Sequence, residues 1–243
     1  MTHRLTATIT LMVAMLMDLM DSTITNVALP TISTDLGATP TQLEWTLVGY
    51  VVAFATLLIT GGRLGDIYGR QRIFLVGVIG FTCASVFASM SWDGNALIAA
   101  RIVQGAFAGI MVPQVLSSVQ VMYTPEERGP VFGVIGSLNA LGVITGLLLG
   151  GWLVTANLFG TGWRSIFLIN VPVGIVLTVM AFLCIPESRS EHPLRLDLTG
   201  SALGATAVIL LVLPLTEGRA AGWAWWIWAL LIAAPFAIVT FIW

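Results

Sequence analysis

Residues 11–30 read Leu11-Met-Val-Ala-Met-Leu-Met-Asp18-Leu-Met-Asp21-Ser-Thr-Ile-Thr-Asn26-Val-Ala-Leu-Pro30, a mostly apolar stretch that contains two aspartates. A run of about 20 predominantly apolar residues is long enough to cross a bilayer as a helix. A carboxylate at the centre of such a helix costs about 3 kcal/mol, so it commonly marks a proton or ion site. Asp18 and Asp21 are therefore the first candidate functional residues, and both are candidate proton carriers.

The composition predicts the same setting for the whole chain. Hydrophobic residues make up 57% of the sequence and charged residues only 9%, whereas soluble domains carry about 25% charged residues. Lysine is absent, and the arginines are too scattered to form a nucleic-acid-binding face. The sequence therefore predicts an all-α polytopic membrane protein with the lipid bilayer as its solvent and no nucleic-acid partner.

Eight apolar stretches are long enough to be candidate transmembrane segments. We expect all of them to be helical, because a helix satisfies its own backbone hydrogen bonds and lipid offers no other partners. They cover residues 8–29, 44–64, 73–90, 96–122, 131–156, 165–185, 198–215 and 225–243. The first is longer than the apolar core of a signal peptide, so we expect it to be retained. Most arginines fall beside alternate connections, at 65–72, 124–130 and 186–197, and the positive-inside rule then places these connections and the amino terminus in the cytoplasm.

The residues that usually serve enzymes and metal sites are scarce. Cys83 and Cys184 fall inside apolar stretches and are interpreted as small core residues, and His3 and His192 lie outside the spans. The sequence therefore predicts no enzyme activity, no metal and no cofactor.

The connection after the second span reads Gly62-Arg63-Leu64-Gly65-Asp66-Ile67-Tyr68-Gly69-Arg70-Gln71-Arg72. Its glycines suit a tight turn and close helix approach, and Asp66 can pair with Arg70 or cap the next helix. This stretch resembles the loop between the second and third spans of the major facilitator superfamily, with Ile67 and Gln71 where a basic residue is common. The resemblance implies that five residues gate the conformational cycle: Gly62, Asp66, Gly69, Arg70 and Arg72.

Two further stretches resemble motifs of proton-coupled members of that superfamily. Arg101-Ile-Val-Gln104-Gly105 is similar to their fourth-span signature, although an arginine in a span can also snorkel to the interface. Residues 142–151 resemble their fifth-span antiporter motif, with Leu147 in place of its proline. The glycines of that motif, which equally suit plain helix packing, are Gly142, Gly146, Gly150 and Gly151.

Residues 19–30 and 163–174 resemble the first-span and sixth-span signatures of the fourteen-span drug:H+ antiporters of that superfamily. The resemblance implies a six-helix bundle over residues 1–186, a cytoplasmic linker over 187–197 and two extra spans over 198–243, about eight helices in all. We expect the chain to be truncated before a second six-helix bundle. The carboxy-terminal half of the same transporter, which would contain that bundle, would then be a partner of this chain.

The function implied by the resemblance is proton-coupled efflux of small hydrophobic or cationic compounds across the plasma membrane. The resemblance implies that Asp21 carries the proton and lies opposite Arg101. Two carboxyls so close together disfavour double ionisation, so one of them should hold a proton. The residues alone do not exclude Asp18 as the proton carrier. A candidate substrate path, for which core packing is the alternative, comprises Asn26, Tyr50, Phe54, Gln104, Met111 and Asn139. Two other functions stay open: a metabolite facilitator of the same superfamily and a non-transporting half-length membrane protein.

Overall fold

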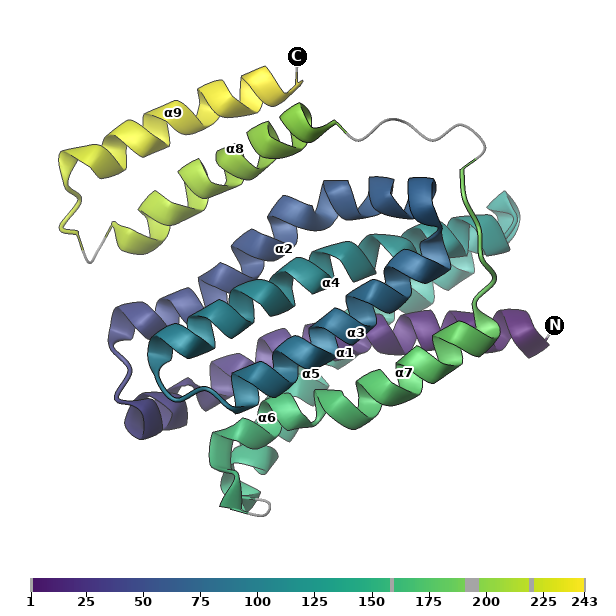
Figure 1. The fold of residues 1–243 in the computed structure, drawn as a ribbon, viewed down its shortest axis with the longest axis horizontal. Helices are drawn as coiled ribbons and strands as arrows, with labels where there is room; N and C mark the ends of the chain where they lie inside the picture. Colours follow the sequence, from purple (N-terminus) through teal and green to yellow (C-terminus); the bar gives the residue numbers. More distant parts are fainter. Residues whose placement is uncertain (1, 158–159, 191–196, 219–220, 243) are drawn as a thin grey trace.

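The computed structural model describes residues 2–157, 160–190, 197–218 and 221–242, and within them every regular element is a helix (Figure 1). The prediction of an all-α protein is therefore confirmed. The elements are α1 (Thr2–Leu36), α2 (Pro40–Tyr68), α3 (Arg70–Ser89), α4 (Gly94–Met122), α5 (Pro125–Ala156), the 3-10 turn η2 (Gly162–Arg164), α6 (Ser165–Leu168), α7 (Asn170–Cys184), α8 (Leu198–Glu217) and α9 (Trp225–Ile242).

Seven of the described helical segments are long and apolar enough to cross a membrane, and α9 is a shorter apolar helix. Together they match the eight predicted spans, with η2, α6 and α7 forming one segment, Gly162–Cys184. Of the predicted linker 187–197, residues 191–196 lie outside the described residues, as does Trp243 at the end of the last predicted span.

The helices extend beyond the predicted spans because their caps lie outside the apolar core. Thr39 and Gln42 form a capping box at the start of α2, with Pro40 in the first turn, and Thr124 and Glu127 form the same arrangement before α5. Such caps satisfy the free N–H groups of a helix start. The predicted starts at residues 44 and 131 are therefore too late by four and six residues.

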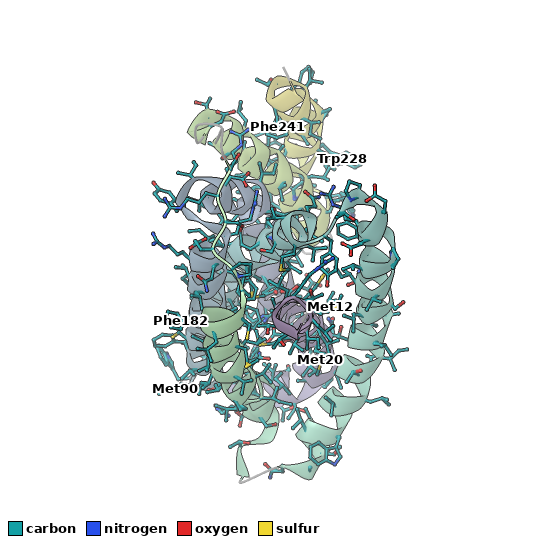
Figure 2. The ribbon with its side chains drawn as sticks, turned by 90° about the vertical axis from the view of Figure 1, so that its right-hand side faces the viewer. Met12, Met20, Met90, Phe182, Trp228 and Phe241 are labelled. Atoms are coloured by element: carbon teal, nitrogen blue, oxygen red, sulfur yellow. The ribbon has the colours of Figure 1, made fainter. Side chains whose placement is uncertain are left out.

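Helix α1 lies inside the bundle, where it packs against α5, α7 and α4. In the end-on view of Figure 2, Met12 and Met20 of α1 lie among the helices, whereas Met90 and Phe182 point away from them. Large apolar side chains cover the outside, among them Phe87 (68% exposed) and Phe182 (71%). An apolar exterior of this extent fits a surface that faces lipid. Cys83 is on this exterior, so its prediction as a core residue is wrong.

Helices α2 and α4 approach closely through glycines. A Cβ atom on Gly105 would collide with the backbone carbonyl of Tyr50, and one on Gly61 would lie 2.8 Å from Cα of Ile110. Glycine permits such backbone contact between membrane helices. The crossing brings Tyr50 of α2 beside Arg101, one turn before Gly105 on α4.

Helix α5 packs on α1 through the glycines of the predicted antiporter motif. Added Cβ atoms on Gly142, Gly146 and Gly150 would lie 3.0, 2.8 and 3.3 Å from atoms of Leu19, Thr23 and Ile24, whereas Gly151 has open space. The three glycines therefore form a flat surface against the turns of α1 that flank Asp21.

The hairpin of α8 and α9 packs beside α2 (Figure 1). Trp45 Nε1 of α2 donates a hydrogen bond to Glu217 Oε1 of α8 at 2.5 Å. This contact ties the hairpin to one end of the six-helix bundle.

The predicted cytoplasmic connections meet at one end of the bundle. Arg4 forms an ion pair with Glu127, and the α2–α3 turn contacts the segment after α7, where Arg70 N donates to Ser188 O at 3.0 Å. The opposite end holds its own contacts, including an ion pair between Arg164 and Asp35 at 2.5 Å. The alternation of connections required by the predicted topology is therefore present in the fold.

Candidate functional site

The two motif residues Asp21 and Arg101 form an ion pair in the middle of the bundle. Arg101 Nη1 lies 2.5 Å from Asp21 Oδ2, and both side chains are only 1% exposed. Arg101 therefore does not snorkel to the interface, which was the alternative interpretation of its position. The two buried charges depend on each other. Removing either partner would leave the other charge uncompensated in a place that water does not reach.

Two amide side chains complete the surroundings of Asp21. Gln104 Nε2 and Asn170 Nδ2 donate to Asp21 Oδ1 at 2.9 and 2.6 Å. The same two groups lie 2.9 and 3.2 Å from Ser85 Oγ, and Gln104 Oε1 accepts from Arg101 Nη1 at 2.7 Å. Three donors thus converge on the carboxylate, which stabilises its ionised form.

Local sequence explains how α4 and α7 deliver three of these groups. Arg101 and Gln104 are three residues apart on α4, so they share one helical face. Asn170 begins α7 directly after a break at Ile169. The break has a chemical cause, because Pro172 has no N–H to offer the carbonyl of Leu168.

A second carboxyl lies one turn before Asp21 on α1. Asp18 is 8% exposed, and Tyr50 OH donates a hydrogen bond to its Oδ1. The Arg101 guanidinium carbon lies 4.1 Å from the centroid of the Tyr50 ring, and Arg101 Nε donates to Thr46 O at 3.3 Å. Tyr50 therefore touches both Asp18 and the arginine that pairs with Asp21.

The residues predicted to line a substrate path fall in different environments. Tyr50 and Gln104 belong to the charged cluster described above, and Phe54 stacks on Tyr50 with ring centroids 6.4 Å apart. Met111 is completely buried in the apolar core. Asn26 and Asn139 are exposed on α1 and α5, so the structure does not bring the six residues together.

A small cavity reaches the cluster from the side. It has a volume of about 120 Å³, lies between α1 and the α6–α7 segment, and Asn170 is its one polar lining residue. Three methionine and leucine side chains of α1 form part of its wall: Leu16, Met17 and Met20. The described residues contain no group of three or more His, Cys, Asp or Glu side chains suited to a metal ion.

The predicted gating residues form a separate network at the end of α2. Asp66 accepts from Arg70 Nη2 at 2.6 Å, and Arg72 Nε lies 3.4 Å from Glu187 Oε2. Gly69 adopts φ = 112°, a conformation that side-chain-bearing residues rarely adopt, and an added Cβ would also meet the Glu187 carboxylate. Gly62 is different, because its Cβ would find ordinary room against Pro113 at 3.7 Å.

Sequence reasoning missed Ser85 and Asn170 as members of the cluster. Asn170 had two usable signals, because it is an amide near the start of an apolar span and lies in the stretch 163–174 that resembles the sixth-span signature. Ser85 had none, since a serine in a helix commonly hydrogen-bonds its own backbone, as Ser85 also does with Phe81 O at 2.9 Å.

Comparison with known proteins identifies relatives for nearly the whole chain. Residues 11–243 match the family model described as Major Facilitator Superfamily. The chain is 44% identical over 229 residues to the "Probable actinorhodin transporter" of Streptomyces coelicolor, covering 94% of this chain and 40% of that protein. It is 37% identical over 216 residues to the "Puromycin resistance protein pur8" of Streptomyces alboniger, covering 88% of this chain and 42% of that protein.

A solved structure of tetrameric PepTSo2 superposes with a TM-score of 0.66 over 89% of this chain and 52% of that one. The sequences are only 16% identical, so this likeness concerns the fold alone. The chain spans about two fifths of the length of the curated relatives named above.

Proposed function

Because the chain belongs to the Major Facilitator Superfamily, we propose that it serves a proton-coupled transporter that exports small hydrophobic or cationic compounds. The superfamily consists of transporters, so the chain is part of a multi-pass membrane transporter and not of an enzyme. The names of its relatives, an actinorhodin transporter and a puromycin resistance protein, support export of drug-like molecules as its direction and substrate class.

The observation that carries the proposal is the buried Asp21–Arg101 ion pair. A carboxylate in a membrane span is costly, and its arginine and amide donors hold Asp21 in one defined position where it can exchange a proton. Binding of a proton to Asp21 Oδ2 neutralises the carboxylate and ends the ion pair, so Arg101 loses its partner. Such a change of buried charge can bias a helix bundle between two conformations.

Other predicted residues take supporting roles in this proposal. The Asp66–Arg70 pair and the Gly69 turn would hold the α2–α3 corner in one conformational state and release it in another. The glycine surface of α5 would let α1 shift against it while Asp21 gains or loses its proton. The side chains of Tyr50 and Phe54 would face the substrate in other states of the cycle, whereas Asn139 is already exposed on α5.

The setting of the cycle is part of the same proposal. We place the protein in the plasma membrane with the amino terminus in the cytoplasm, since the arginine-rich connections gather at one end of the bundle. Transport itself is proposed for a protein of the relatives' length, in which a second helix bundle would face this one.

Inverted membrane vesicles containing the full-length protein test the proposal. We expect a fluorescent cationic dye to accumulate in energised vesicles, and nigericin, which removes the pH gradient, to abolish that accumulation. Valinomycin, which removes the membrane potential, is the matched treatment that separates the two driving forces. Dye accumulation that persists unchanged when both gradients are removed would exclude proton coupling.

A further inference from the structure

Asp18 is a buried carboxyl that forms no ion pair within the described part of the chain. It is 8% exposed, and its described hydrogen bond comes from the Tyr50 hydroxyl. Among the described residues, Arg101 forms an ion pair with Asp21, and Asp18 forms no ion pair. An ionised carboxylate in such a place would need more compensation than one phenol supplies.

The charged and titratable groups around Asp18 are few. Tyr50 hydrogen-bonds it from α2, Asp21 lies one turn further along α1, and Arg101 of α4 is near enough to act on it electrostatically. The other described segments against α1 bring no titratable side chain to this level, because the charged residues of α5 lie in its first turn and Arg164 lies at the far end of the bundle. Among the described residues, one cation therefore lies near two carboxyls, and it is ion-paired with Asp21.

The two carboxyls are unequally supplied with donors. Asp21 accepts from Arg101, Gln104 and Asn170, whereas Tyr50 is the one donor to Asp18 among the residues that the structure describes. In the conformation observed, the ionised carboxylate therefore belongs to Asp21, and the neutral acid is the form of Asp18 that matches its surroundings. With one proton on Asp18, the cluster of two aspartates and one arginine has no net charge.

Tyr50 connects the two halves of this cluster. Its ring lies beneath the guanidinium of Arg101, 4.1 Å from centroid to carbon, while its hydroxyl binds Asp18. The ring is held in place by Phe54, which stacks on it with an interplanar angle of 10°. Arg101 and Asp18 thus contact the same tyrosine, Arg101 on the face of the Tyr50 ring and Asp18 at its hydroxyl.

We propose that Asp18 is a second proton-binding site that shares Arg101 with Asp21, and that Tyr50 positions the arginine between them. The inference rests on the proposed function for its place in a transport cycle. When Asp21 binds a proton from solution, Arg101 is freed, and Asp18 can release its own proton to solution and take over the arginine. One proton is gained and one is lost, so the buried cluster stays neutral throughout the exchange.

Infrared difference spectroscopy of the purified full-length protein in lipid nanodiscs tests the inference. A neutral carboxylic acid has a carbonyl stretch well separated from the bands of a carboxylate. We expect this band at neutral pH in the parental protein and its loss in Asp18→Asn. Asp21→Asn leaves Arg101 without its carboxylate, as a proton on Asp21 does, so Asp18 should ionise and the band should weaken there too. Absence of the band from the parental protein, its persistence in Asp18→Asn or an unchanged band in Asp21→Asn would overturn the proposal.

Tyr50→Phe provides a second test that keeps every carboxyl in place. Loss of the phenol removes the donor to the Asp18 carbonyl oxygen, so the band should persist and move to higher frequency. Tyr68→Phe is the matched control, because Tyr68 is 53% exposed at the end of α2, and it should leave the band unmoved. A band unmoved by Tyr50→Phe contradicts the hydrogen bond between Tyr50 and the neutral acid of Asp18.

These spectra are recorded without any drug. They therefore report the protonation of Asp18 even if the protein does not export drugs. Asp35→Asn is the control for carboxyl removal, since Asp35 belongs to the same helix but is paired with Arg164 at its half-exposed end. It should leave the neutral-acid band unchanged.

Discussion

Asn170 shows how a neutral side chain can define the state of a buried carboxylate. Its amide donates to Asp21 Oδ1 at 2.6 Å and is 3% exposed. Hydrogen bonds to a charged acceptor are stronger than those between neutral groups, at about 1.5–3 kcal/mol. The amide therefore contributes to the ion pair without carrying charge itself.

Asn170→Ala should destabilise the folded protein by about 1–3 kcal/mol, because Asp21 loses one of its three donors while remaining buried. The apparent melting temperature of the purified full-length protein in detergent measures the effect. Asn139→Ala is the matched control, since Asn139 is exposed on α5, and it should change stability little. Equal melting temperatures for the two variants would mean that the Asn170 amide is not needed by the cluster.

At this scale the sequence identified charged residues better than neutral ones. Asp21, Asp18 and Arg101 stand out because a charge in an apolar span is rare and costly. Neutral donors carry no such signal, and Ser85 in particular is indistinguishable in sequence from any helical serine. The contact between Tyr50 and Asp18 could not be predicted either, because it depends on how α2 packs against α1.

The approach of α2 to α4 depends on single glycines. Gly105 leaves no room for a Cβ atom against the Tyr50 carbonyl, and Tyr50 and Arg101 meet at the same crossing. A methyl group at this point would force the helices apart. The charged cluster is therefore sensitive to the side-chain volume of a residue that takes no part in its chemistry.

Gly105→Ala should destabilise the protein by about 1–3 kcal/mol, the usual cost of adding a methyl to a tightly packed site. Gly136→Ala makes the same substitution on α5, where a Cβ would meet nothing within 4 Å. That control should be neutral or slightly stabilising, by up to about 1 kcal/mol. The melting temperatures of the two variants decide the matter, and a Gly105→Ala protein as stable as the control would refute the tight crossing.

At the scale of elements, the apolar pattern predicted how many helices there are, but not where they end. Helix caps such as Thr39 and Thr124 lie in polar sequence outside the spans, so a hydropathy window stops short of them. The break at Ile169 was also missed, although Pro172 supplies a reason for it. Gly62 and Gly65 belong to the same recognisable motif, yet an added Cβ would clash with α4 at Gly65 and find ordinary room at Gly62.

The whole molecule has two distinct ends. One end joins the amino terminus, the α4–α5 connection and the α2–α3 turn, and the other joins Asp35 with Arg164 and Trp45 with Glu217. The fold thus separates the ends as the arginine pattern predicts. The side of the membrane on which each end lies remains a prediction from the positive-inside rule.

Cysteine labelling in whole cells tests that orientation. In a full-length protein with Cys83→Ser and Cys184→Ser, we introduce Gly129→Cys at the end predicted to be cytoplasmic and Asn95→Cys at the other. A Cβ at Gly129 meets nothing within 4 Å, so the substitution should be tolerated. A membrane-impermeant thiol reagent should label only Asn95→Cys, and labelling of Gly129→Cys alone would reverse the orientation.

The central claim concerning the whole protein is that a proton on Asp21 drives transport. Asp21→Asn retains the size and polarity of the side chain but removes the titrating proton. Asp35→Asn makes the same change on the same helix, outside the charged cluster. Both variants of the full-length protein are reconstituted into proteoliposomes that contain a pH-sensitive dye.

The measurement is drug-induced proton movement across these proteoliposomes. We predict that the parental protein and Asp35→Asn move protons when drug is added, and that Asp21→Asn does not, although it inserts and elutes as a folded protein. Proton movement by Asp21→Asn at the parental rate would contradict the account, because the coupled proton would then bind elsewhere.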